Sequence, residues 1–146
     1  MAFDRQGTGW VVLRICLGVF LIFQAIGKLS WFMDSSILNG ELGLWLQNAA
    51  RGSISEAYLQ RIAVPGVAVF ARLVPLGEFV CGAALLVGFM TPLFAFVAFL
   101  LVLNYQIAGG AIFQLSFLAS RSGLPVLGST LALAIGGARL PWSIRS

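Results

Sequence analysis

The chain contains no histidine and two cysteines among its 146 residues. Histidine is the commonest protein ligand of haem iron, copper and catalytic zinc, so we expect no haem or metal ion to be ligated by this chain. Cys16 and Cys81 lie in separate apolar stretches and form no Cys-x-x-Cys pair, the pattern that a thiol–disulfide enzyme would show. The sequence therefore argues against both a conventional metal centre and a dithiol active site.

Charge is also scarce, since 10% of the residues are Asp, Glu, Lys or Arg, whereas 60% are hydrophobic. A soluble domain carries about 25% charged residues, so this chain lacks the polar surface that would keep it dissolved in water. The net charge of +4 could indicate a nucleic-acid partner, but the 9 basic residues are scattered along the chain. Basic residues that flank membrane spans explain the excess better, and we exclude nucleic acid.

The sequence contains several long apolar stretches. A helix that spans a membrane needs about 20 mainly apolar residues. The predicted spans are residues 10–29, 66–90, 92–113 and 123–140. Thr91-Pro92 predicts a tight turn between the second and third spans, because proline forces the preceding residue out of helical geometry. The predicted fold is all-α: residues 1–146 form a single domain, an integral membrane four-helix bundle in contact with membrane lipids.

Small residues predict where the backbones of neighbouring spans approach one another. On the second span these are Gly77 and Cys81, and on the fourth span Gly128, Ala132 and Gly136. We interpret both faces as packing surfaces.

Residues 30–65 form the extended polar region of the sequence, between the first two spans. Ser53 with Glu56 three residues later is typical of a capping box and predicts a short helix after Ser53. Long ordered loops tend to be functional, so we expect this loop to carry short helices and to act as a cap over the bundle or as a docking surface. A plain connector is the alternative.

The balance of charges near the span ends predicts the orientation. An even number of spans places both termini on one side, together with Arg5, Arg139 and Arg145, and with Asp4 against them. By the positive-inside rule, this side is the cytoplasm. We expect an integral protein of a bacterial or archaeal cytoplasmic membrane with cytoplasmic termini.

Charged side chains interrupt the predicted spans at Arg14, Arg72 and Glu78. A charge in the hydrocarbon core costs about 2.5–3.5 kcal/mol on insertion scales, so such residues pair, reach the interface or line a functional cavity. At a helical rise of about 1.5 Å per residue, Arg14 lies about 6 Å inside the cytoplasmic end of its span and Glu78 about 18 Å deep in the next. We predict that these two side chains reach each other as a pair that carries protons.

A second polar group is predicted in the outer half of the bundle, beneath the long loop. Its members come to comparable depth from three spans: Gln24, Lys28, Arg72, Asn104 and Gln106. Together with the Arg14–Glu78 pair they predict a pocket that binds the polar head group of a lipophile such as a quinone. The alternative is that ion pairs and amides join the helices without any ligand, which is common between transmembrane helices. Arg72 could also extend to the outer head groups, which would remove it from any site.

Two stretches of residues 10 to about 110 also resemble a known family. The motifs are Arg14-x-x-Leu17-Gly18-x-Phe20, followed by Gly27-Lys28-Leu29, and then Glu78-x-x-x-Gly82-x-x-Leu85-Leu86-x-Gly88-x-x-Thr91. Their order and spacing resemble the DoxX/DoxD family, which includes the small membrane subunit of thiosulfate:quinone oxidoreductase. The resemblance implies a four-helix membrane protein associated with redox enzymes, and it carries over to Arg14, Lys28 and Glu78.

Two functions stay open at this point, and a third, a small transporter or channel, is disfavoured because four spans are few for one protomer and no internal repeat stands out. The first is a quinone-interacting membrane subunit of an oxidoreductase, with thiosulfate as the donor that the resemblance implies. The second is a non-catalytic accessory subunit of a larger respiratory or photosynthetic electron-transfer complex. In both, the partners are other subunits of a membrane redox complex, and the residues leave open whether this chain is itself an enzyme.

Overall fold

The computed structural model describes residues 5–120 and 123–144, and all the regular elements among them are helices. The longest are α1 (Arg5–Gly27), α5 (Val67–Val87), α6 (Thr91–Ala108) and α7 (Leu124–Gly136). The shorter elements are α2 (Leu29–Met33), α3 (Ser35–Asn48), α4 (Ile54–Tyr58), the π-helix η1 (Leu59–Ala63), and the 3-10 helices η2 (Ala111–Phe113) and η3 (Leu115–Ala119). The predicted all-α class is confirmed.

Three described helices are long and apolar enough to cross a membrane: α1, α5 and α6. The predicted fourth span at residues 123–140 differs, because α7 has 13 residues and ends at Gly136. Such a helix is about 20 Å long, whereas the hydrocarbon core is about 30 Å thick, so α7 alone is too short to span it. Two consecutive glycines, Gly136 and Gly137, followed by Pro141 explain the early end of the helix.

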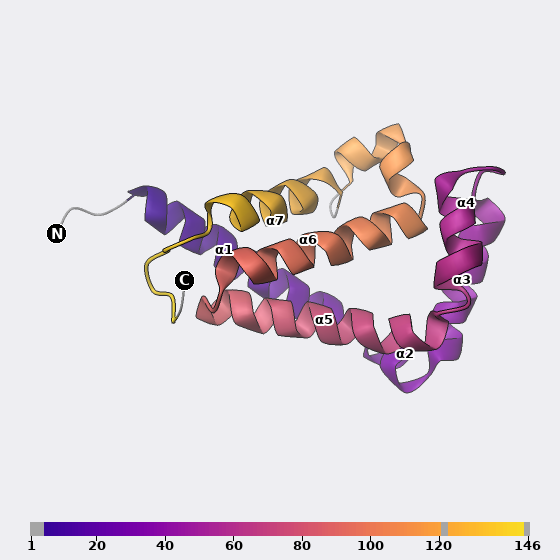
Figure 1. Ribbon diagram of the computed structural model, residues 1–146, viewed down its shortest axis with the longest axis horizontal. Helices are drawn as coiled ribbons and strands as arrows, with labels where there is room; N and C mark the ends of the chain where they lie inside the picture. The colour runs from indigo at the N-terminus through magenta and orange to yellow at the C-terminus, as the bar shows by residue number, and fades with distance from the viewer. Residues whose placement is uncertain (1–4, 121–122, 145–146) are drawn as a thin grey trace.

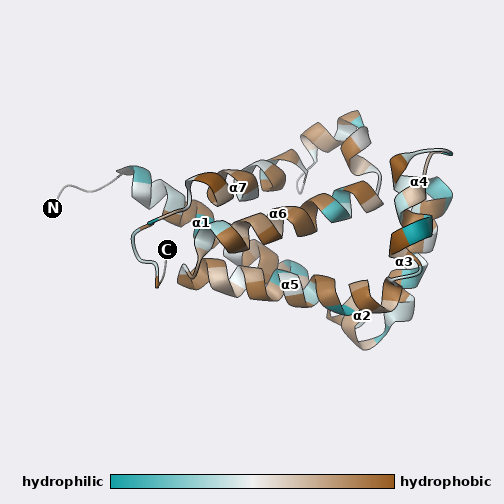
Figure 2. Cartoon of the chain, viewed as in Figure 1, coloured by the Kyte–Doolittle hydropathy of each residue, from teal (hydrophilic) through white to brown (hydrophobic). Residues whose placement is uncertain are grey.

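The long helices lie side by side, as Figure 1 shows, with both ends of the chain at one end of the molecule. α1 packs on α5 and α7, and α6 packs on α5 and α7. Their shared core consists of small and branched apolar residues, including Leu21, Leu85, Ala95, Ala98 and Leu133. In Figure 2 hydrophobic residues dominate α6 and α7, whereas α3 and α4 mix both kinds. Asp4 and Arg145, two of the charges used to predict orientation, lie outside the described residues.

The backbones of α1 and α5 come close together at Gly18 and Gly82. A Cβ atom on Gly18 would lie 2.9 Å from the Gly82 carbonyl oxygen, and one on Gly82 would lie 2.8 Å from the Gly18 carbonyl oxygen. Gly18 also faces Leu86, and Gly82 faces Ile22. This contact fixes how far the two helices are displaced along each other, and it therefore decides which polar residues can meet.

Residues 29–63, from α2 to η1, form a cap across the end of the long helices opposite the termini (Figure 1). The cap has a core of its own, which includes Trp31, Leu38 and Leu42, and this core packs on Ala71 of α5 and Ala108 of α6. Short helices in this region were predicted, and they are confirmed.

The cap helices begin where side chains satisfy the first free backbone N–H groups. At α3, the Asp34 carboxylate accepts a hydrogen bond from the Ser36 backbone N–H at 2.9 Å. At α4, the Ser53 hydroxyl accepts one from the Glu56 backbone N–H at 3.1 Å, as the sequence predicted. The Glu56 carboxylate accepts in return from the backbone N–H of Gly52, at 2.6 Å, one residue earlier than in the usual capping box.

Candidate functional site

A buried ion pair joins the end of α1 to the middle of α5. Lys28, between α1 and α2, donates from Nζ to Oε1 of Glu78 at 2.5 Å. Both side chains are buried, with exposed fractions of 11% for Lys28 and 8% for Glu78. It is the one ion pair among the side chains that the structure describes. Since isolated buried charges are strongly disfavoured, each of these groups depends on the other.

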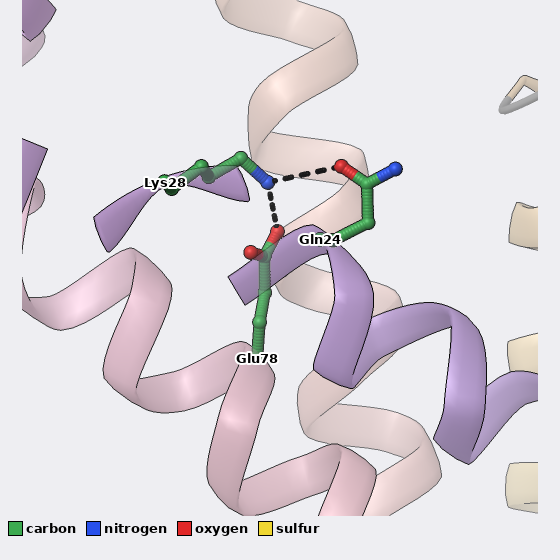
Figure 3. A network of polar contacts seen from close by, with 3 residues as sticks. All are labelled: Gln24, Lys28 and Glu78. Carbon is green, nitrogen blue, oxygen red and sulfur yellow. Dashed lines mark hydrogen bonds and ion pairs between the residues drawn. The ribbon is translucent and has the colours of Figure 1, made fainter. Parts of the chain in front are cut away.

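Gln24 and two aromatic rings surround the ammonium group of Lys28. Figure 3 shows Gln24 on α1 pointing toward Lys28, and its Oε1 accepts a hydrogen bond from Nζ at 3.4 Å. The ring of Trp31 lies 5.7 Å from Nζ and the ring of Tyr105 lies 5.4 Å from it, both within cation–π range. The ammonium group is thus held by a carboxylate, an amide and two aromatic faces.

A cavity of about 110 Å³ opens beside this ion pair, between α1, α5 and α6. Half of its lining is polar: Gln24, Lys28, Glu78 and Gln106. The other half is apolar or aromatic: Phe20, Leu21, Val102 and Tyr105. We call this space the polar cavity, and its lining combines one cation, one anion and two amides with apolar walls.

The ion pair retains hydrogen-bonding capacity beyond the contacts it makes. Oε2 of Glu78 is buried and has no hydrogen-bond partner among the described residues. Lys28 has three N–H donors, and the described contacts use two of them, on Gln24 and Glu78. A buried polar atom without a partner is costly unless a ligand or water satisfies it. Chemically, the site can donate to a carbonyl oxygen and can take up or release a proton at a carboxylate.

The predicted Arg14–Glu78 pair is wrong. Arg14 is buried at the opposite end of the long helices, where Nη1 donates to the Ser143 hydroxyl at 2.7 Å and Nη2 donates to the Trp142 carbonyl at 3.0 Å. Gly88 lies against the guanidinium group, and a Cβ atom there would be 1.9 Å from Nη1. Arg14 therefore joins the C-terminal segment to the turn between α5 and α6.

Arg72 does not join the predicted polar group either. Its side chain is exposed, and Nη1 donates to the Ala68 carbonyl of its own helix at 2.8 Å. An exposed arginine near the end of an apolar helix can extend toward the lipid head groups, and this removes the energetic need for a partner inside the bundle.

The two predicted polar residues of α6 lie on different sides. Gln106 is buried and lines the polar cavity with Gln24, Lys28 and Glu78, so the structure brings these four predicted residues together. Asn104 instead accepts a hydrogen bond from the Tyr58 hydroxyl of the cap. Neighbours two residues apart on a helix point in different directions, which accounts for the separation.

Sequence reasoning missed Trp31 and Tyr105 as members of the site. Trp31 follows Lys28 by three residues, and Tyr105 adjoins Gln106, so both were close to predicted residues in the sequence. An aromatic ring beside a lone buried cation is a recurrent arrangement, and this pairing is the signal that could have found them.

Comparison with protein-family models gives a match over residues 9–111 to the family described as DoxX. Comparison with curated proteins and with solved structures gives no match. The matched region includes Arg14, the whole cap, the Lys28–Glu78 pair and α6, and it covers more than half of the chain. With its three span-capable helices, this chain is a membrane protein that belongs to the DoxX family.

Proposed function

We propose that this protein is a membrane subunit of a redox complex and that its polar cavity binds the head group of a quinone. The observation that carries the proposal is the buried Lys28–Glu78 pair in the cavity wall, with Oε2 of Glu78 left without a partner among the described residues. Purely structural pairs usually satisfy their buried atoms within the protein. Here a residue that lines the cavity keeps a buried acceptor that no described residue uses.

The size and lining of the polar cavity support a single-ring head group. A dry cavity of about 150 Å³ accommodates benzene in another protein, so about 110 Å³ with an open side suits one ring whose tail extends into lipid. The free N–H of Lys28 and the amide of Gln24 are placed to donate to a ring carbonyl oxygen. Phe20, Val102 and Tyr105 would contact the faces and edges of the ring.

A bound quinone would supply an acceptor for two electrons and two protons. The residues of this chain would orient it and handle protons. Lys28 fixes the position of the Glu78 carboxylate through Oε1, and Oε2 is the atom at which Glu78 would hold or release a proton. Apolar walls on the remaining sides limit access of water to the same carboxylate.

Electrons would come from a partner subunit, since the sequence offers no histidine and no Cys-x-x-Cys pair to hold a conventional electron carrier. A sulfur compound such as thiosulfate is the donor that the family resemblance suggests. We further propose that α7 and residues 137–144 complete a four-helix bundle with α1, α5 and α6, and that the shared end of the termini faces the cytoplasm of a bacterial or archaeal cell.

The second candidate is a non-catalytic accessory subunit of a larger electron-transfer complex. One observation favours it: Arg14, a family-motif residue, holds the C-terminal segment and is not among the residues that line the polar cavity. If the motif charges exist to fix the shape of the bundle, the Lys28–Glu78 pair could serve the same end.

Purification from the native membrane in mild detergent separates these candidates. We expect quinone, extracted and identified by mass spectrometry, to accompany the wild-type protein together with a donor-oxidising partner. We expect the Lys28→Met variant to lose most of this quinone. Arg72→Gln is the matched control, because it removes an exposed positive charge from α5, the helix that carries Glu78. The R72Q protein should retain the quinone.

Equal quinone content in the wild-type and K28M preparations would refute the cavity assignment. Absence of quinone from a stable complex with haem- or pigment-bearing subunits would favour the accessory function.

A further inference from the structure

A line of three cavities runs from the outer surface of the cap to the ion pair. The first is a groove of about 500 Å³ between the α3–α4 connection and the end of α6. The second is a small, partly open pocket of about 30 Å³ lined by the cap core and α6, which we call the inner cavity. The third is the polar cavity beside Lys28 and Glu78. Together these cavities extend from the outer end of the cap toward the buried carboxylate of Glu78. The side chain of Tyr105 separates the second cavity from the third.

Neighbouring cavities in this line share wall residues. Trp45 and Ala108 line both the groove and the inner cavity. Tyr105 lines both the inner cavity and the polar cavity. The rings of Trp45 and Tyr105 touch each other edge to face, with their centroids 5.1 Å apart and their planes at 86°. One aromatic contact between the cap and α6 therefore stands between the groove and the ion pair.

The groove and the inner cavity offer polar groups for water. The groove is lined by Asn48, Ser53, Ser55 and Gln114 beside apolar residues. The inner cavity is lined by Tyr58 and Asn104, which hydrogen-bond to each other, and its volume suffices for one water molecule, which needs about 10–15 Å³. Water can bind to these polar groups in the groove and the inner cavity. The contact between the Trp45 and Tyr105 rings leaves no room for water.

The same region is where the cap is attached to α6. The Ser55 hydroxyl donates to the Ile107 carbonyl at 2.7 Å, and the Tyr58 hydroxyl donates to Asn104. These bonds lie on α4, whereas Trp45 lies on α3, so the aromatic contact can separate while α4 stays attached. A π-helix follows Tyr58 directly, an element that often marks functional sites.

We propose that the Lys28–Glu78 pair exchanges protons with water through the cap, by way of the groove and the inner cavity, and that the Trp45–Tyr105 contact is the closed gate of this route. The assignment of the route to protons rests on the proposed function of Glu78, but the existence of the route does not. Lipophilic ligands would reach the polar cavity from the bilayer, between α1 and α6. Water and ligand would then approach the ion pair from different directions.

The titratable groups around Glu78 fit such a route. Lys28 faces it from the start of the cap, Tyr105 from α6, and Cys81 lies one turn further along α5. Tyr105 thus adjoins both the charge that would change and the space from which a proton would come.

Labelling of an introduced cysteine tests the route without any quinone. In a background with Cys16→Ser and Cys81→Ala, Gln24→Cys places a thiol in the wall of the polar cavity. The purified full chain in lipid nanodiscs is treated with Ag⁺, a thiol-reactive cation close in size to the one water molecule that the inner cavity can hold. We expect slow labelling at residue 24 and an acceleration of about tenfold or more when Trp45→Ala removes the aromatic contact and its buried area.

Two variants serve as controls. Phe96→Ala removes an aromatic ring from α6 at a position that is 46% exposed and away from the cavities, and it should leave the labelling rate unchanged. Ala108→Leu fills the passage between the groove and the inner cavity, and it should slow labelling in the W45A background. The lipid-soluble reagent N-ethylmaleimide should label residue 24 at the same rate with or without W45A, which rules out a collapsed bundle.

An unchanged Ag⁺ labelling rate in W45A, or an equal acceleration by F96A, would overturn the proposed route. Because no quinone is present, failure of the quinone proposal would leave this result unaffected, and failure of the route would leave quinone binding open to its own test.

Discussion

At the scale of single residues, the Lys28–Glu78 pair is the feature with the largest energetic consequence. A buried ion pair offsets its own desolvation only when both charges are present and hydrogen-bonded. Here Lys28 has the carboxylate of Glu78, the amide of Gln24 and two aromatic faces around its ammonium group. Each partner therefore stabilises the protein mainly by preventing the other from being buried alone.

We predict that Lys28→Met destabilises the protein by about 3–5 kcal/mol, because it leaves the Glu78 carboxylate buried without a cation. The double variant K28M/E78Q should be more stable than K28M, since a neutral amide replaces the unpaired carboxylate. Thermal unfolding in detergent, followed by tryptophan fluorescence, measures both. A double variant whose loss equals the sum of the two single losses would contradict the coupling.

The sequence predicted four residues that line the polar cavity, but it also included Arg72 and Asn104, which lie elsewhere, and it gave Glu78 the wrong partner. The Gly18–Gly82 contact brings Ile22 close to Gly82 and Leu86 close to Gly18, so antiparallel α1 and α5 place Arg14 beyond Gly82, toward Gly88. From there, Glu78 is about eight helical positions or 12 Å away along the axis, beyond the reach of a side chain that is already bonded. Depth estimates from guessed span ends could not reveal this displacement between the helices.

At the scale of elements, glycine positions decide how closely the helices pack. Gly18 and Gly82 form the tight contact between α1 and α5, although neither was among the small residues that the sequence singled out for packing. Of those that were, a Cβ atom on Gly77 would come within 3.0 Å of Leu101, and one on Gly136 within 2.8 Å of Trp10, whereas one on Gly128 would meet no atom within 4 Å. Composition alone could not distinguish a glycine in contact from one in open space.

We predict opposite effects for two glycine-to-alanine substitutions. Gly82→Ala forces the backbone of α1 away and should destabilise the protein by about 1–3 kcal/mol. Gly128→Ala, also within a helix, meets no neighbour and should stabilise it by about 0.5–1 kcal/mol through the helical preference of alanine. Thermal unfolding followed by circular dichroism compares the two. The prediction fails if G128A is the more damaging change.

The attachment of the cap to α6 should depend on pH through Tyr58. Burial raises the pKa of the Tyr58 phenol above its ordinary value. Since the folded-state pKa is the higher one, the contribution of Tyr58 to stability is complete below the ordinary tyrosine pKa of about 10 and is lost as pH rises through the folded value. A phenolate has no hydrogen to donate to Asn104, so the cap should loosen at that pH.

An absorbance titration at the tyrosinate band measures this midpoint in a Tyr105→Phe background, which leaves Tyr58 as the remaining tyrosine of the 2 in the chain. We expect a midpoint above that of a free tyrosine. Asn104→Leu is the comparison, because it removes the acceptor and leaves the burial. A midpoint at or below the free value in the Y105F protein would contradict the buried position of Tyr58.

At the scale of the whole molecule, Arg14 connects the first helix to the last described residues of the chain. Residues 139 and 142 have left-handed backbone angles, with φ of 58° at Arg139 and 55° at Trp142. Such angles cost about 1–2 kcal/mol per non-glycine residue, so the surrounding contacts must hold this segment in place. The two hydrogen bonds from Arg14 provide such a contact, and Gly88 provides the space for the guanidinium group.

We predict that Arg14→Lys releases the C-terminal segment, because lysine cannot reproduce both bonds of the planar guanidinium group. A charge-assisted hydrogen bond contributes about 1.5–3 kcal/mol, so cleavage by trypsin at exposed Arg139 should accelerate about tenfold or more. Mass spectrometry of the fragments gives the rate. Arg72→Lys, at an arginine bonded to its own helix, should cleave like the wild type, and an R14K rate equal to the wild-type rate would refute the role of Arg14.

The long apolar helices thus lie between two different ends of the molecule. One end carries the cap and the polar cavity, and at the other, the closed end, Arg14 bonds to residues 142 and 143. The family assignment and the three spans follow directly from sequence pattern, because long apolar runs and ordered glycine motifs are local signals. The closed end and the short α7 do not, since they depend on contacts between residues far apart in the chain, such as Arg14 with Ser143.

Photoaffinity labelling with a single-ring quinone that carries a photoreactive group is the measurement that tests the proposed quinone site most directly. The cross-linked peptides are identified by mass spectrometry in native membranes. We predict labels on residues 20–28, at and just beyond the end of α1, and on residues 102–106 of α6. Unlabelled quinone should compete with this labelling, and K28M should abolish it. Labels confined to lipid-facing residues such as Leu73, Phe79 and Phe96, without competition, would contradict it.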